Sequence, residues 1–582
     1  MLPRLWAWRR PQTSTRDYTT VVVPLDEAHE HSHAYRSGQR NAEREGNSDD
    51  GAFEDEAGGD KDDDEEGMGM LLTSRQVREY SIEGLRREVR TGGGVEKSTA
   101  YEMKSRLINK AIQDIGMGRY NWQLFVLCGF GWFADNLWMQ GVSLTLPSLS
   151  AEFGISEKLV RYTTSSLFVG LCFGSFFWGI GSDIMGRRVA FNVTLLIASV
   201  FGTASAWASS WGGVCFMYAA LGFGVGGNLP VDGALFLEFL PDASSSLLTL
   251  LSIWWPIGQL CSSLFAWYFI AHWPADQGWR YFVMTIGVVT FVMFLVRFFL
   301  FRMFESPKYL LSRGRQAEAV AVVQGIAHKN SRKTWLTEDI LEAVVDGPAD
   351  PSLNRLSASG IIRTRLASFS AERIRPLFHT RKLALTTSLI WFCWATIGMG
   401  YPLFNAFLPQ YLSHGGNKPD DSLAPEITGE TYRNYAITSI AGVPGSLLAA
   451  YTVDMNSPFL GRRGTLAIST LISAVFLFLF VQLGTTPSSQ LAFSCVEAFA
   501  QNIMYGVLYA FTPEIFPAPV RGAGTGVASF LNRATGLLAP IIAATVPGNG
   551  TTAPVYLSAV LILAAFGAVC GIPIETRGRQ RL

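Results

Sequence analysis

The sequence predicts an all-α membrane protein with twelve transmembrane helices, arranged as two pseudo-symmetric six-helix bundles. Three observations support this fold class. The composition suits lipid as a solvent, because 49% of the 582 residues are hydrophobic and only 16% are charged. Twelve segments are predominantly apolar over about 20 residues, the length that crosses the hydrocarbon core of a bilayer. In addition, two charged signatures each occur twice, which indicates an internal duplication.

The duplication rests on two markers that share one offset. The signature at 181–188 recurs at 454–463 with a four-residue insertion, so that the arginine pairs lie 275 residues apart (463 minus 188). Glu238-Phe-Leu-Pro recurs as Glu514-Ile-Phe-Pro, 276 residues later (514 minus 238). Many secondary transporters consist of repeated helix bundles with the substrate site between them. The symmetry therefore predicts a transporter.

The predicted spans fall into two groups of six on either side of a basic loop. They lie at about 122–148, 162–181, 189–208, 212–240, 247–271, 280–303, 383–411, 434–453, 465–484, 488–513, 522–546 and 553–574. The expected domains are a cytosolic tail at 1–118, an N-terminal bundle at 120–303, a cytosolic basic loop at 304–382, a C-terminal bundle at 383–574 and a cytosolic tail at 575–582.

The first 118 residues are expected to be mostly disordered. Their hydrophobicity is low, and acids cluster at 54–56 and 62–66, a composition that cannot bury enough apolar surface to fold. Near 99–119 apolar residues recur at helical spacing, which predicts a short amphipathic helix. That helix would lie on the inner leaflet or pack on the central loop.

The distribution of basic residues predicts which side each loop faces. Arginine pairs follow the second and eighth spans, and both ends of the 304–382 loop are basic, whereas 412–433 carries several acids. Because cytosolic loops are enriched in Lys and Arg, both termini are expected in the cytosol. The acidic first 118 residues suggest eukaryotic sorting, with the plasma membrane favoured over a vacuolar or vesicle membrane. The sequon at Asn549 falls on the outer side, and the sequence leaves its glycosylation open.

The repeated signature predicts a gate at the cytosolic end of the bundles. Asp183 would stabilise the positive end of a neighbouring helix, while Arg187 and its neighbour reach the carboxylate of Glu238. The second half repeats this arrangement, and such ion pairs would hold one conformation and release in the other. The predicted gating residues are Asp183, Arg187, Arg188, Glu238, Asp454, Arg462, Arg463, Glu514 and Arg521.

These paired signatures, with Phe304-Glu-Ser-Pro-Lys-Tyr-Leu310 and Ile574-Glu-Thr-Arg-Gly578, resemble the major facilitator superfamily and most closely its sugar-porter-like members. The stretches 116–125, 134–135 and 226–230 are similar to the branch of synaptic-vesicle-protein-related (SVOP-like) and bacterial nicotinate (NiaP-like) transporters. The resemblance implies a twelve-helix facilitator that works by alternating access. It leaves the substrate open, because that branch handles varied organic solutes.

Ionisable residues inside membrane spans are costly, which makes them functional candidates. Asp135, near the middle of the first span, would exchange a proton or contact a polar substrate. Arg533, at about mid-depth in the eleventh span, would anchor a substrate carboxylate or pair with Glu497 to fix packing. The predicted substrate and coupling residues are Asp135, Asn136, Asn228, Asp232, Gln259, Asn405, Glu497, Gln501, Asn532 and Arg533.

The sequence therefore predicts a secondary active transporter of a small polar organic solute, coupled to protons, with an organic anion or carboxylate as cargo. A hexose-like sugar is the alternative cargo, and a non-transporting nutrient sensor is the alternative from another class. The Gly-x-Gly-x-x-Gly match at 222–227 lies inside an apolar span with no strand before it, so close helix packing explains it better than nucleotide binding. No enzyme activity, cofactor, metal or nucleic-acid partner is expected, and the transport unit is expected to be a monomer.

Overall fold

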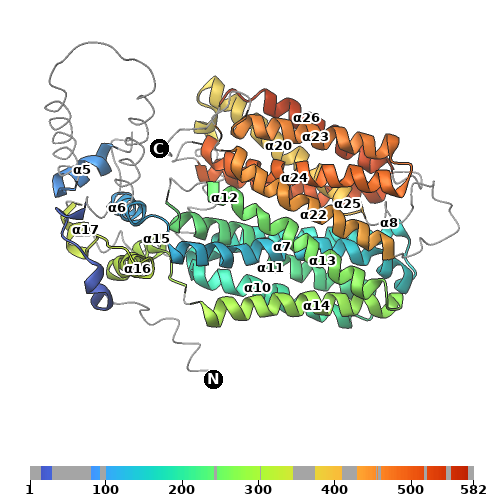
Figure 1. Ribbon diagram of the computed structural model, residues 1–582, viewed down its shortest axis with the longest axis horizontal. Coiled ribbons are helices and arrows are strands. Elements are labelled where there is room, and N and C mark those ends of the chain that lie inside the picture. The colour runs from blue at the N-terminus through green and yellow to red at the C-terminus, as the bar shows by residue number, and fades with distance from the viewer. Residues whose placement is uncertain are drawn as a thin grey trace, which may run out of the picture.

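The computed structural model describes residues 15–28, 80–91, 100–241, 246–301, 303–344, 374–408, 429–453, 455, 460–516, 521–545 and 552–574. Over these residues the chain is helical apart from short connections and an isolated parallel bridge between Val22 and Thr334. Long helices run side by side through the main body, and a group of shorter helices lies at one end of it (Figure 1). This end is termed the cap end, and the opposite end the far end.

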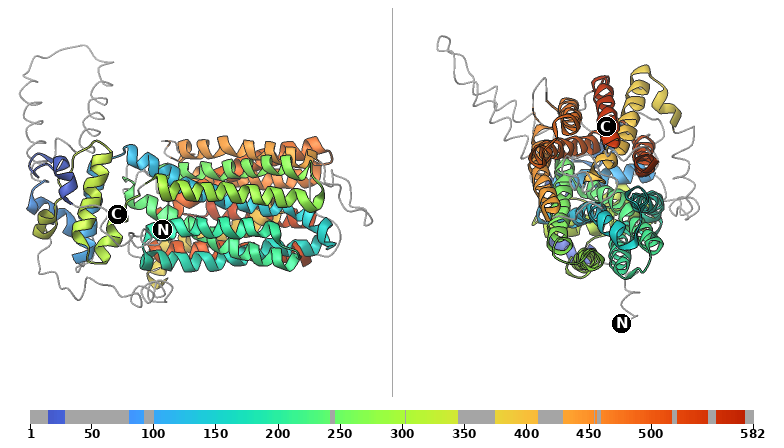
Figure 2. Two further views of the ribbon diagram at one scale, coloured as in Figure 1. Left: turned by 90° about the horizontal axis from the view of Figure 1, so that it is seen from below. Right: turned by 90° about the vertical axis from the view of Figure 1, so that its right-hand side faces the viewer.

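Within the described residues, six long helices lie in each half of the main body. The first half consists of α7 (Arg119–Phe153), α9 (Tyr162–Met185), α10 (Arg187–Ala204), α11 (Trp211–Phe239), α13 (Trp254–Ile270) and α14 (Ala275–Leu295). The second half consists of α20 (Arg381–Asn405), α22 (Gly429–Thr452), α23 (Arg462–Leu483), α24 (Pro487–Ile515), α25 (Arg521–Thr545) and α26 (Thr552–Cys570). Short elements join them: α8 (Glu157–Val160), η3 (Ser205–Trp207), α12 (Ser246–Leu250), η5 (Leu251–Ile253), η6 (Val296–Leu300) and η7 (Arg375–Phe378). Figure 2 shows these helices packed as a bundle from two further directions.

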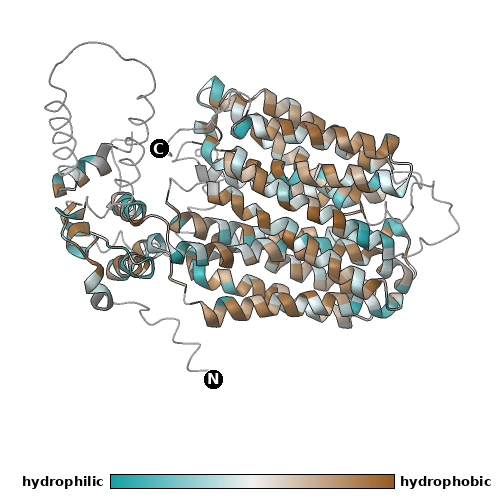
Figure 3. Cartoon of the chain, viewed as in Figure 1, coloured by the Kyte–Doolittle hydropathy of each residue, from teal (hydrophilic) through white to brown (hydrophobic). Residues whose placement is uncertain are grey.

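Ten helical segments in the described part of the chain are long and apolar enough to cross a membrane. The two remaining long helices, α7 and α22, have 35 and 24 residues, so each exceeds the length that spans the hydrocarbon core. Their mean hydropathy is lower because polar residues such as Asp135 and Asn434 interrupt them. Figure 3 shows long apolar stretches on the outside of the main body, where residues such as Phe173 and Phe299 are exposed. The protein is therefore a multi-pass membrane protein.

Glycines let α9 and α11 approach each other closely. A side chain at Gly222 would meet the backbone of Leu167, and one at Gly226 would meet the backbone of Leu171. On the other helix, Gly170 lies equally close to the backbone of α11. The glycine run at 222–227 is thus a helix-packing surface, the role small residues usually have between membrane helices.

The shorter helices form a unit that is termed the helical cap. It consists of residues 15–28 with η2 (Thr15–Val21), α5 (Ile82–Thr91), α6 (Ala100–Ile115), α15 (Pro307–Ser312), α16 (Gln316–Lys329) and α17 (Glu338–Val344). The amphipathic helix predicted near 99–119 corresponds to α6. Its apolar face, including Leu107 and Ile112, is buried in the cap, and Lys104 donates a hydrogen bond to Gln316 at 2.6 Å. Of the two predicted positions, packing on the central loop is the one observed.

Two stretches of the first segment, which the sequence predicts to be mostly disordered, are folded in the structure: 15–28 and 80–91. Val23 donates its backbone N–H to the carbonyl of Thr334 at 3.1 Å, and Thr334 donates to Val21 at 3.0 Å. Both valines are almost completely buried in the apolar core of the cap. A composition averaged over the long acidic segment does not reveal this short run of three valines. The run buries enough apolar surface to dock on a folded surface.

We expect Val23→Asp to release the first segment from the cap. Burying a valine side chain contributes about 1.5–3 kcal/mol, and the introduced carboxylate adds a desolvation cost. Hydrogen exchange of the Val21–Val23 amides should accelerate, while exchange in α7 should stay unchanged. Thr20→Asp is the matched control because Thr20 is exposed. Equal protection in both variants would contradict the docking of residues 15–28.

Candidate functional site

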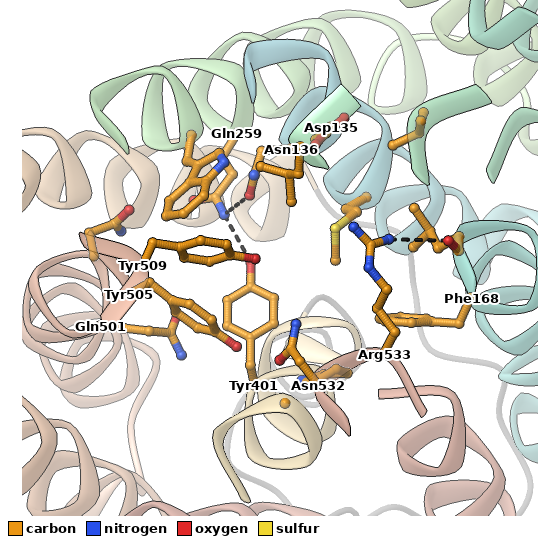
Figure 4. Close-up of a pocket in the computed structure, with 18 residues that line it drawn as sticks. Asp135, Asn136, Phe168, Gln259, Tyr401, Gln501, Tyr505, Tyr509, Asn532 and Arg533 are labelled. Atoms are coloured by element: carbon orange, nitrogen blue, oxygen red, sulfur yellow. Dashed lines mark hydrogen bonds between the residues drawn. The ribbon is translucent and has the colours of Figure 1, made fainter. Parts of the chain in front are cut away.

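A cavity of about 100 Å³ lies between the two halves of the main body, lined by both. This volume is several times what one water molecule needs. Side chains from α7, α9, α11 and α13 form one wall, and side chains from α20, α24 and α25 form the other (Figure 4). The polar lining residues are Asp135, Asn136, Gln259, Gln501, Asn502, Asn532 and Arg533. The helix pairing thus brings together six of the residues predicted from the sequence: Asp135, Asn136, Gln259, Gln501, Asn532 and Arg533.

The first wall carries a buried acid. The Asp135 side chain accepts a hydrogen bond from the Asn228 amide at 2.9 Å, and Asp135 is only 3% exposed. In the described part of the chain, Asp135 forms no ion pair. Beside it, the Gln259 amide donates to Asn136 at 2.9 Å and to the hydroxyl of Tyr401 at 3.0 Å. The second of these bonds joins the two halves.

The second wall carries a base. Arg533 of α25 donates to the backbone carbonyl of Leu171 in α9 at 3.1 Å, which is another link between the halves. Among the described residues, no carboxylate lies within ion-pair distance of Arg533. An acidic side chain, Asp135, and a basic one, Arg533, therefore line the same cavity without forming an ion pair.

Tyrosines complete the cavity, and the sequence analysis missed them. The rings of Tyr401 and Tyr505 meet edge to face with centroids 5.3 Å apart. Trp255 contacts Tyr509 with centroids 5.2 Å apart. Gln501, Tyr505 and Tyr509 follow one another at intervals of four residues, which places them on one face of α24. That spacing is a signal the sequence contains.

Asp232 does not line the cavity, although the sequence analysis named it with the substrate residues. It forms an ion pair with Arg297 at 2.8 Å, and both side chains are completely buried. Arg297 lies in the π-helical turn η6, donates to the carbonyls of Leu127 and Phe191, and stacks over the Phe191 ring at 3.7 Å. Through Arg297, the pair joins α7, α10 and α11 to the segment that follows α14.

We expect Arg297→Leu to destabilise the protein strongly. Removing one partner of a buried ion pair costs about 3–5 kcal/mol because the other charge stays buried and uncompensated. The double variant Asp232→Asn/Arg297→Leu should recover a large part of the loss. Yield and thermal unfolding in detergent measure both effects. If the double variant unfolds at the same temperature as the single one, the proposed cause is wrong.

The remaining predicted residues lie behind the walls. Asn405 donates to Gln501 at 3.0 Å, and Asn228 supports Asp135 as described above. Glu497 accepts a hydrogen bond from Ser473 at 3.3 Å and is 1% exposed. The ion pair between Glu497 and Arg533 that the sequence left open is not present.

The described residues of the predicted gate lie at the cap end, in a separate cluster in each half. Arg187 contacts Asp183 at 3.4 Å and Glu238 at 2.9 Å, and Arg462 forms an ion pair with Glu514. Of the remaining gating residues, Arg463 donates to the carbonyl of Cys570 at 2.7 Å and Arg188 lies at the start of α10, whereas Asp454 and the side chain of Arg521 fall outside the described residues.

Glu305, which the sequence analysis did not include among the gating residues, is a further member of the first-half cluster. It accepts the backbone N–H groups of Arg187 and Arg188, at 3.1 and 3.3 Å, at the positive end of α10. Burial raises the pKa of the Glu305 carboxyl group, and the backbone N–H bonds from Ser306 and Arg188 offset part of this rise. The cluster thus ties two helices of the first half to the connection that leads into the cap.

Comparison with known proteins adds three similarities. The family model described as Major Facilitator Superfamily matches residues 124–458. The protein named MFS siderochrome iron transporter 1, from Ceriporiopsis subvermispora, is 41% identical over 529 residues, which cover 88% of this chain and 99% of that protein. The synaptic vesicle 2-related protein of Bos taurus is 29% identical over 528 residues, covering 87% and 89%.

Among solved structures, the proton:xylose symporter XylE bound to 6-bromo-6-deoxy-D-glucose superposes with a TM-score of 0.59. The alignment covers 79% of this chain and 98% of that chain at 17% sequence identity. At this identity the likeness shows the fold alone.

Proposed function

This chain belongs to the Major Facilitator Superfamily, and we propose that it carries a small organic acid across the membrane together with a proton. The family match confirms the resemblance indicated by the paired signatures, and with it a membrane transporter that is not an enzyme. The observation that carries the proposal is the cavity in which Arg533 and Asp135 lie without an ion pair between them.

Arg533 is the proposed binding group for the acid. A guanidinium forms strong, paired hydrogen bonds with a carboxylate, especially where water is excluded. In the structure, one N–H group of Arg533 donates a hydrogen bond to the carbonyl of Leu171 in the opposite half. A substrate carboxylate would compete for that donor and loosen this contact. Substrate binding would thereby favour the relative movement of the halves that alternating access requires.

Asp135 is the proposed proton carrier. It is buried, bonded to the neutral Asn228 amide, and has no counter-charge at ion-pair distance among the described residues. An acid in that position inside a membrane protein is a candidate for proton exchange. Binding a proton there would balance the negative charge that the substrate brings into the cavity.

The size of the cavity argues for a compact cargo. Sites for drug-sized ligands have volumes of roughly 300–1,000 Å³, whereas this cavity has about 100 Å³. The name of one relative points to a siderochrome, but a ferric siderochrome complex would require a much larger space. Tyr401, Tyr505 and Tyr509 offer ring faces and edges that suit a small planar acid.

A hexose-like sugar is the second candidate, and one observation favours it. Amide side chains on both walls, including Asn136, Gln259 and Asn532, match the many hydroxyl groups of a sugar. Trp255 lines the same cavity and could stack on a sugar ring. A sugar, however, would leave the Arg533 charge without a partner.

The distribution of basic residues supports a proposal for the orientation of the protein in the membrane. We propose that the cap end faces the cytosol, because Arg187, Arg462 and the basic ends of the 304–382 loop gather there. Both termini would be cytosolic, the plasma membrane is the proposed location, and one chain is the proposed transport unit. The ion pairs of Arg187 and Arg462 each lie within one half, so they would fix the cap-end helices of their own half and rearrange when the halves rock.

We expect acids to stabilise the purified protein more than their uncharged amides. A ligand that binds the folded state raises thermal stability by mass action. Nicotinate is compared with nicotinamide, benzoate with benzamide, and gluconate with glucose, each at equal concentration. A larger shift for the acid of a pair supports the proposal, and counterflow of that labelled acid in proteoliposomes then separates a transporter from a sensor. Larger shifts for glucose than for every acid would favour the sugar instead.

A further inference from the structure

A stripe of buried polar side chains runs along one face of α24, from the far end of the bundle to the cavity. Gln490, Ser494, Glu497 and Gln501 are spaced by four, three and four residues, which places them on one helix face. All four are almost completely buried. The stripe begins two residues after the exposed segment 485–488. It ends at Gln501, which lines the cavity, so it extends over about 16 Å.

Three atoms of this stripe have hydrogen-bonding capacity that the described residues leave unused: Gln490 Oε1, Glu497 Oε2 and Gln501 Nε2. The other halves of these side chains are occupied, because Gln490 donates to Gly484 at 3.0 Å and Glu497 accepts from Ser473 at 3.3 Å. Buried polar atoms are nearly always satisfied, by protein or by water. A series of unsatisfied atoms along one face therefore fits a line of water molecules.

Glu497 is the single ionisable group of the stripe. In the described part of the chain it has no ion-pair partner. Tyrosines of three helices around it lie within electrostatic reach of Glu497: Tyr401 of α20, Tyr435 of α22 and Tyr505 of α24. None of them supplies a positive charge. A buried carboxyl group without a cation is costly unless it carries a proton.

We propose that this stripe is a proton-access path in the second half, in which Glu497 binds a proton that exchanges between the far end of the bundle and the substrate cavity. Glu497 gives its proton to water beside Gln501 and takes another from water beside Gln490, so no net charge is left in the helix face. The inference goes beyond the proposed role of Asp135, because it adds a second proton-carrying group on the opposite side of the cavity.

The carbonyl stretch of a protonated carboxyl group, recorded by infrared spectroscopy on the full-length protein in lipid, tests the proposal. Glu497→Gln should remove one such band, and Asp135→Asn serves as the control that leaves it in place. In wild-type protein the band should shift when the buffer is changed from water to D₂O, because the proton is exchangeable. A spectrum in which Glu497→Gln removes no band overturns the proposal.

The route is tested by a variant that leaves Glu497 in place. Gln490→Met removes the outermost polar group of the stripe and should slow the D₂O shift of the band by about two- to tenfold, the range that corresponds to the net free energy of one hydrogen bond. Gln482→Met is the matched control, because Gln482 is exposed at the same end of the bundle. Equal exchange rates in both variants would contradict this route. Neither measurement involves substrate, so the results are independent of whether the cargo is an acid.

Discussion

Asp135→Asn is expected to abolish proton-driven accumulation of the transported acid and to leave exchange of labelled for unlabelled acid intact. Asparagine keeps the size of the side chain and can still bond to Asn228, but it cannot bind a proton in this way. With one proton per substrate, a pH difference of one unit supports roughly tenfold accumulation in the wild-type protein, since each tenfold ratio corresponds to about 1.4 kcal/mol. The variant should reach no more than the external concentration.

Uptake into proteoliposomes with an imposed pH difference measures this effect, with nicotinate as the probe if it shifts the thermal stability. Asp276→Asn is the matched control, because Asp276 is exposed at the far end and does not line the cavity. Exchange must persist in Asp135→Asn for the result to report on coupling rather than on folding. Accumulation at wild-type level in Asp135→Asn would exclude this side chain as the coupling group.

The arrangement of the membrane helices could be read from the sequence because it depends on local properties. Apolar length and loop charge are visible in any window of about 20 residues. The two least apolar helices, α7 and α22, were also found, since Asp135 and Asn434 interrupt long segments that are otherwise rich in apolar and small residues. The repeated signatures then showed how the halves correspond.

The site could be predicted only in part, because pairing depends on distances in space. Depth in the membrane pointed to Asp135 and Arg533 as separate candidates, and the structure places both in the lining of one cavity. Depth alone could not distinguish Asp232 from the residues that line the cavity, because its partner Arg297 lies 65 residues later on another helix. The same limit left the pairing of Glu497 with Arg533 open, and the structure shows that it does not form.

The cap shows a different limit. A disorder prediction from composition averages over many residues, so the acids at 54–66 outweighed the three valines at 21–23. Whether such a run folds depends on a receiving surface elsewhere in the chain, here the segment around Thr334. Nothing local to the first segment specifies that surface.

Arg533→Gln should weaken binding of an acid far more than binding of its amide. Truncating one partner of a buried, hydrogen-bonded charge pair costs about 2–4 kcal/mol, which corresponds to a roughly 30- to 1,000-fold rise in the dissociation constant of the acid. The amide makes no ion pair with Arg533, so its affinity should change less than about threefold. Titration of nicotinate and nicotinamide, followed by thermal stability, gives both values in one protein.

Two further variants separate charge from shape. Arg533→Lys keeps the positive charge but loses the planar paired donors, so it should recover part of the acid affinity and remain well below wild type. Gln501→Leu removes a polar group from the same wall without touching the charge, and should weaken both ligands to a similar degree. If Arg533→Gln weakened acid and amide equally, Arg533 would act through its contact with Leu171 rather than through the carboxylate. The cargo would then have to be sought among neutral solutes, with the amides of the cavity walls as the binding groups.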